Sequence, residues 1–248
     1  MKSARLSRIL PILLLLAAGS ASASGVNLSW DACTPEGGVQ NKTFACNTNL
    51  GSRTMFGSFV LASDSPHAVG IVARVDITAA ADSLPAWWRF DGPNLCRIGL
   101  SSSFSFVSDP NTDCVDPWSG QATGATAAYY TFWTSPQVPG GNPATAQPLL
   151  ICAVRIESAV ALSAGTEYYG FKLTLSSTKT VGSGACAGCS TPVCITLSEV
   201  EVDGSDNSTQ AVTAPIVAST VTWQSAGQCP GSFSSQNVSW GQIRSVLR

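Results

Sequence analysis

Val69-Gly-Ile-Val-Ala-Arg-Val-Asp-Ile-Thr-Ala79 is the stretch that decides the fold, because apolar residues occupy every second position. Successive side chains of a β-strand point to opposite faces, so this period predicts a strand with one buried and one wetter face. Between Leu197 and Val200 the apolar phase shifts, which predicts a β-bulge at residues 198–199. Similar alternation marks residues 149–157, 169–176 and 193–202, and weaker strand patterns cover residues 26–30, 55–61, 96–107 and 217–223.

These patterns predict an all-β protein, an antiparallel two-sheet β-sandwich of about eight or nine strands, because a strand with one apolar face needs a second sheet to cover it. Residues 24–239 are expected to form this single domain. Residues 108–147, rich in Gly, Pro, Thr and Asn, are expected to form one long loop, and long loops are often functional. Trp240, Ile243 and Leu247 recur at helical spacing and predict a short C-terminal helix over 240–248.

The N-terminus has the pattern of an export signal. Three basic residues, Lys2, Arg5 and Arg8, precede the apolar run 9–18, and Ala21-Ser-Ala23 follows as a small-residue cleavage site. The alternative, a membrane anchor, would need an apolar run of about twenty residues. We therefore expect residues 1–23 to be a signal peptide and the mature protein to be secreted or periplasmic.

The net charge of the chain disfavours some classes of binding partner. The formal net charge is −2 with a single histidine, and loss of the basic signal leaves the mature chain more acidic. Nucleic acids and anionic membrane surfaces are poor partners for such a protein. A polysaccharide or a cell-surface protein remains as the expected partner.

Nine cysteines behind an export signal predict disulfides. Nine is odd, and Cys152 is expected to be the unpaired one, because it shares an apolar strand face with Val154 and Ile156. The spacing suggests Cys33 with Cys46, Cys96 with Cys114, one bridge within the cluster Cys186, Cys189 and Cys194, and one from that cluster to Cys229.

The motif Cys186-Ala-Gly-Cys189 leaves two further interpretations open. A redox motif of this spacing would need a βαβ setting, whereas the motif lies between predicted strands. A zinc site would need two more ligands, for which Cys194 and Cys229 are the candidates. A disulfide staple is the simplest interpretation.

Two acidic loops resemble partial calcium sites, which makes calcium the candidate cofactor. In the first loop, side chains that carry oxygen ligands occupy alternate positions. Asp203–Asn207 forms a shorter second loop. The alternative is turn chemistry, in which short Asx side chains bond their own backbone. The candidate ligands of the first loop are Asp109, Asn111, Asp113 and Asp116.

Catalytic patterns are weak. His67 is the sole histidine, and no Gly-x-Ser-x-Gly nucleophile motif accompanies it. A glycosidase needs only two facing carboxyls, but any β protein carries such residues. The candidates are Glu157, Glu167, Glu199, Glu201 and several Asp residues.

Aromatic residues are the better functional lead, because exposed rings stack on sugars. Trp87 and Trp88 are adjacent, so on a strand one of them would face outward. The alternative is that these rings pack in the core. The candidate ligand-binding residues are Trp88, Trp118, Tyr129, Tyr130 and Trp133. The sequence thus predicts a non-enzymatic secreted binding or structural protein, with a carbohydrate-active protein that uses the 118–133 loop as the alternative.

Five stretches carry a resemblance to secreted proteins of environmental bacteria: VNLSWDAC (26–33), NKTFAC (41–46), LPAWW (84–88), CAGCSTPVC (186–194) and SWGQIRSVLR (239–248). This resemblance implies an exported protein and implies no activity. The strand pattern is also loosely similar to bacterial immunoglobulin-like and cohesin-like sandwiches, a likeness of architecture alone.

Overall fold

The computed structural model describes residues 24–89, 96–97, 102–109, 114–131, 145–213 and 219–224. The predicted signal peptide (1–23) and C-terminal helix (240–248) lie outside these ranges. Helical structure within them is limited to the short 3-10 helices η1 (Thr34–Glu36), η2 (Ala86–Trp88) and η3 (Ile156–Ser158). No helix in the described ranges is long and apolar enough to cross a membrane.

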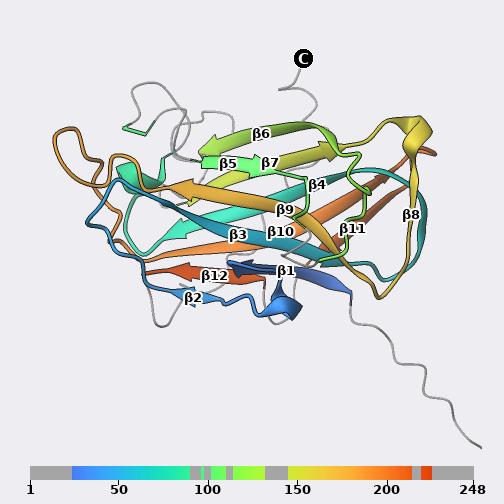
Figure 1. Ribbon diagram of the computed structural model, residues 1–248, viewed down its shortest axis with the longest axis horizontal. Coiled ribbons are helices and arrows are strands. Elements are labelled where there is room, and N and C mark those ends of the chain that lie inside the picture. The colour runs from blue at the N-terminus through green and yellow to red at the C-terminus, as the bar shows by residue number, and fades with distance from the viewer. Residues whose placement is uncertain are drawn as a thin grey trace, which may run out of the picture.

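Two sheets build the protein, and their long strands run along its longest axis (Figure 1). The smaller sheet has the order β1 (Gly25–Trp30), β3 (Ser52–Val60), β9 (Glu167–Ser176) and β5 (Ser102–Ser105). The larger has the order β2 (Asn41–Lys42), β12 (Thr220–Trp223), β10 (Val193–Gly204), β4 (Ser65–Ala79), β7 (Thr145–Ala153) and β6 (Thr123–Thr131), with β11 (Thr209–Thr213) on β10 and β8 (Val160–Leu162) on β4. All these strand pairs are antiparallel except β2 with β12.

One hydrophobic core joins the two sheets, as the alternating pattern predicts. The apolar series of β4, from Ile71 to Ile77, is buried in the same cluster as Phe59 and Leu173 of the smaller sheet. The expected bulge is confirmed, because the register of β10 against β4 shifts between Leu197 and Glu199. The protein is therefore all-β with two antiparallel-rich sheets, an arrangement consistent with the predicted sandwich.

A second irregularity lies in β9. It shows that the regular alternation expected over residues 169–176 was wrong at Tyr169. Gly57 lies opposite Phe171 and Ser58 lies opposite Tyr169, so Gly170 is skipped. Tyr169 consequently packs on the outer face of the sheet, whereas the core face continues through Phe171. A Cβ on Gly57 would lie 2.2 Å from the Phe171 ring. Glycine is required there because it lets the ring cross the neighbouring strand.

Two other expectations about strands were wrong. The long loop expected over 108–147 contains β6 and the start of β7, which pair with each other. Its small residues gave no apolar alternation, yet the backbone pairs because β7 continues the larger sheet beside β4. Ile156 is also not on a buried strand face, because β7 ends at Ala153 and Ile156 is 68% exposed in η3.

Three disulfides cross-link segments far apart in the sequence: Cys33–Cys114, Cys46–Cys189 and Cys96–Cys186. The expected local pairs, Cys33 with Cys46, Cys96 with Cys114 and one within the 186–194 cluster, were therefore wrong. Sequence spacing misled because the sheets bring distant segments together. The sulfurs of the 186–189 motif are used in these bridges, which removes the redox and zinc interpretations. Cys194 is also disulfide-bonded, and the predicted link to Cys229 lies outside the described residues.

Five aromatic rings close one end of the core. Trp223 is the hub, with ring-centroid distances of 4.2 Å to Phe44, 5.0 Å to Trp87, 5.2 Å to Trp88 and 6.1 Å to Trp30. Its indole N–H donates to the carbonyl of Cys189 at 2.6 Å. The cluster thus connects both sheets with the segment that carries Phe44.

Candidate functional site

The aromatic residues predicted to bind sugar do not form an exposed platform where the structure describes them. Trp88 is fully buried in η2, since residues 86–88 form a 3-10 helix rather than a strand, and Trp87 beside it is also buried. Trp118 is fully buried as well. Tyr129 and Tyr130 lie in β6 opposite Pro148 and Gln147, and their side chains, like Trp133, lie outside the description.

The candidate calcium residues are only partly described. The Asp116 carboxylate accepts hydrogen bonds from the backbone N–H groups of Trp118 and Gly120 at 2.8 and 2.7 Å. Asp116 therefore has the contacts expected of an Asx side chain in a turn. Asp206 likewise accepts from the backbone and hydroxyl of Ser208, and these bonds lower the pKa of Asp206. Asn111 and Asp113 lie outside the description, and no metal-like cluster occurs among the described residues. Calcium binding at Asp109 to Asp116 therefore stays a prediction.

The candidate catalytic groups are held in separate places. Glu167 Oε1 accepts from Asn27 Nδ2 at 2.8 Å and from Ser58 Oγ at 2.6 Å on the outer face of the smaller sheet. Glu199 pairs with Arg74 at 3.2 Å on the larger sheet. Glu201 lies further along β10, Glu157 lies in η3, and the exposed His67 lies near the start of β4.

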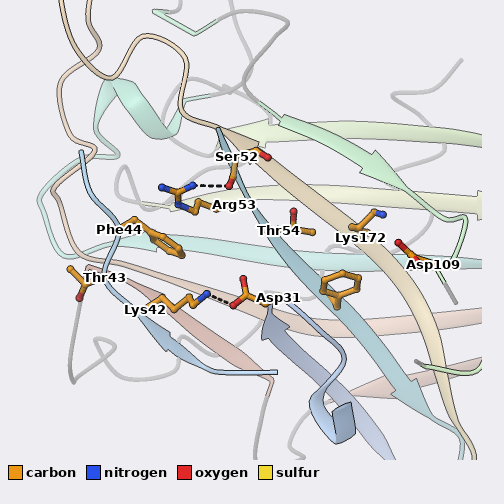
Figure 2. A pocket seen from close by; sticks show the side chains of 10 residues that line it. Asp31, Lys42, Thr43, Phe44, Ser52, Arg53, Thr54, Asp109 and Lys172 are labelled. Atoms are coloured by element: carbon orange, nitrogen blue, oxygen red, sulfur yellow. Dashed lines mark hydrogen bonds and ion pairs between the residues drawn. The ribbon is translucent and has the colours of Figure 1, made fainter. Parts of the chain in front are cut away.

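A different site emerges where β1 stops short of β3. β1 ends at Trp30 opposite Met55, whereas β3 begins at Ser52. A groove of about 550 Å³ lies beside this uncovered part of β3. Its charged lining residues come from five separate segments: Asp31, Lys42, Arg53, Asp109 and Lys172. We call this site the charged groove (Figure 2).

Hydroxyl groups and aromatic edges complete the charged groove. Thr43, Ser52 and Thr54 contribute hydroxyls. Phe44 and Phe56 also line it, but they are only 8% and 3% exposed, so they offer little apolar surface. The lining that a ligand would meet is therefore mainly polar and charged.

The wall that carries Lys42 and Phe44 is fixed from behind. The Gln224 side chain both accepts from the backbone N–H of Phe44 and donates to its carbonyl, at 3.1 and 2.5 Å. The Cys46–Cys189 disulfide ties the end of the same segment to the turn that precedes β10. The short strand β2 alone could not hold this wall, so the disulfide and Gln224 give the groove its shape.

The site residues predicted from the sequence did not include Lys42, Arg53 or Lys172. Each is an isolated basic residue in a strand pattern, and solvated strand faces carry such residues routinely. One signal was available: only 13 Lys and Arg residues occur in 248 positions, so three of them around one groove is a concentration. Recognising it requires the pairing of β3 with β9, which places Lys172 opposite Phe56.

Comparison with protein-family models and with curated protein sequences found no match for this chain.

Cys152 is the free cysteine of the described residues and is buried, as predicted. Burial, and then the charge of Asp116, raise the pKa of its thiol from 9.0 to about 12. We expect iodoacetamide to label Cys152 in the unfolded, unreduced protein and to leave it unlabelled in the native protein near neutral pH. Mass spectrometry of the alkylated peptides checks this, and rapid native labelling of Cys152 would contradict it.

The same shift predicts how Cys152 contributes to stability at high pH. Above the ordinary thiol pKa of 9.0, the unfolded chain loses this proton while the folded protein keeps it. The free energy of unfolding therefore falls as the pH rises toward the folded-state pKa of about 12. Cys152→Ala removes this contribution and serves as the control.

Proposed function

We propose that the protein is a non-enzymatic extracellular binding module and that its ligand is a polysaccharide held in the charged groove. The observation that carries the proposal is the lining of the groove, in which hydroxyls, carboxylates and cations from separate segments border one hollow at the uncovered edge of β3, with Arg53 on the core-facing side of the strand and Lys172 on the outer face of the sheet. Its volume lies within the usual range for ligand sites, about 300–1,000 Å³. Sugar hydroxyls both donate and accept hydrogen bonds, so they match such a mixed lining.

The scaffold around the groove also supports a binding role. Three disulfides fit a protein of an oxidising, extracellular compartment. The lining is mounted on long paired strands and on a disulfide-tethered wall, and such pre-organisation lowers the entropic cost of holding a ligand.

Hydrolysis is the alternative, because two carboxylates, Asp31 and Asp109, line the same groove. The Asp31 carboxylate is engaged in an ion pair with Lys42, so hydrolysis would require Asp109 as the proton donor. The assay for new reducing ends distinguishes this alternative from binding.

The test is affinity gel electrophoresis of the mature protein against a panel of neutral and acidic polysaccharides, with a parallel assay for new reducing ends. We expect retardation by at least one polymer and no new reducing ends. Thr54→Trp should fill the groove and abolish retardation, whereas Thr209→Trp, at an exposed position of β11, should not. Retardation that Thr54→Trp leaves unchanged would place the ligand elsewhere, and new reducing ends would establish hydrolysis.

A further inference from the structure

The three cations of the charged groove differ in how they are engaged. The Lys42 ammonium is in an ion pair with Asp31 (Figure 2). Arg53 donates from Nη1 to the carbonyl of Ser52 at 2.8 Å, and its guanidinium carbon lies 5.3 Å from the centre of the Phe44 ring. These contacts orient Arg53 and leave its other N–H groups for a ligand.

Lys172 is the least engaged of the three. It lies on β9 between Phe56 of β3 and Ser105 of β5, so both neighbouring strands fix its position. Among the described residues its ammonium has neither an ion pair nor a hydrogen bond, and the side chain is half-buried. Asp109 lies beside Lys172 in the groove without a direct hydrogen bond to it (Figure 2), so the ammonium keeps its donors for an anionic ligand, and charge-assisted hydrogen bonds are about twice as strong as neutral ones.

The anions in the same groove limit what kind of acid can bind. Asp31 and Asp109 would repel a ligand that carries negative charge at every position. They would instead accept hydrogen bonds from hydroxyl groups. The lining therefore fits a ligand in which widely spaced carboxylates alternate with many hydroxyls.

We propose that the ligand of the charged groove is an acidic polysaccharide built from hexuronate units, whose carboxylates bind Arg53 and Lys172. This inference rests on the proposed function and assigns its ligand class. Hydroxyls of the same sugar units meet Asp31, Thr54 and the other polar lining residues. Lys42, which Asp31 neutralises, shapes the groove wall and contributes less to the recognition of charge.

An acidic peptide is the competing ligand, and the groove suits it less well. Peptides and proteins gain most of their affinity from apolar or aromatic anchors seated in pockets. Phe44 and Phe56 are almost fully covered, so the groove offers such an anchor little surface. A sugar acid needs no anchor of that kind.

The experiment is isothermal titration calorimetry of the mature protein with oligogalacturonate and with its methyl ester, which keeps the hydroxyls and removes the charge. We expect the acid to bind and the ester to bind at least tenfold more weakly. Added salt should lower the affinity for the acid. Arg53→Gln and Lys172→Gln should each weaken binding of the acid about tenfold or more while leaving binding of the ester unchanged. Arg155→Gln, at an exposed position in the segment between β7 and η3, is the matched control and should bind like the native protein.

The outcomes separate the two proposals. Equal affinity for acid and ester would overturn the ligand class and leave the proposed function standing. If neither the acid nor the ester binds and no polymer of the panel retards the protein, the proposed function is overturned. Binding of poly-glutamate in place of the sugar acids would overturn both in favour of an acidic peptide. Melting temperatures of all variants verify that each loss of affinity occurs in a folded protein.

Discussion

Removal of the Cys46–Cys189 disulfide is expected to lower the free energy of unfolding by about 2–5 kcal/mol, the usual cost for a native bridge. The bridge spans 143 residues, so it closes a long loop of the unfolded chain. Its loss also frees the wall of the charged groove, because Phe44 and Lys42 lie just before Cys46. The variant Cys46→Ser with Cys189→Ser should therefore lose both stability and ligand affinity.

The matched control removes a different bridge of similar reach. Cys96–Cys186 spans 90 residues, and neither of its cysteines lines the groove. Cys96→Ser with Cys186→Ser should lower the free energy of unfolding by a comparable amount and leave the affinity of the folded protein unchanged. Denaturant titration measures stability, and calorimetry with the bound polysaccharide measures affinity. Equal losses of affinity in the two variants would contradict a specific role for the Cys46 tether.

Trp223→Ala is expected to cost about 3–5 kcal/mol of unfolding free energy, as truncation of a buried tryptophan does. Trp223 is 1% exposed and contacts four other aromatic rings, so its loss leaves a large cavity between the sheets. It also removes the donor to the Cys189 carbonyl. Trp223→Phe keeps a ring in place and should cost distinctly less.

Urea unfolding of the native protein and the two Trp223 variants measures these differences. A cost below about 1 kcal/mol for Trp223→Ala would show that the aromatic end of the core relaxes around the cavity, contrary to the packing described above. Equal costs for the alanine and phenylalanine variants would assign the effect to the indole hydrogen bond rather than to the ring.

Arg97 shows how a single cation can serve the scaffold rather than the site. It is 2% exposed, donates from Nη1 to the carbonyl of Trp87 at 3.0 Å and from Nη2 to that of Ser176, and lies 3.7 Å from the centre of the Trp87 ring. Burial lowers the pKa of Arg97 to about 10, so it stays charged near neutral pH. Its contacts link the η2 segment to the end of β9.

The strands and their core faces were predictable from the sequence because they depend on local periodicity. The series from Ile71 to Ile77 needs no information beyond its own alternation, and the bulge after Leu197 is visible as a change of phase. The buried free thiol of Cys152 follows in the same way from its apolar strand neighbours.

The disulfide pairs, the burial of Trp88 and Trp118, and the charged groove were decided by the tertiary structure alone. Cys46 pairs with Cys189 because two sheets bring together segments 143 residues apart, a proximity that spacing in the chain does not encode. Trp88 is buried because it packs in the aromatic end of the core against Trp87 and Trp223, and Trp118 is buried in the same hydrophobic core, whereas the residue type alone does not distinguish a core ring from an exposed one. The groove exists because β1 ends before β3 does, so Arg53 and Lys172 border it from opposite faces of the smaller sheet only after the strands have paired.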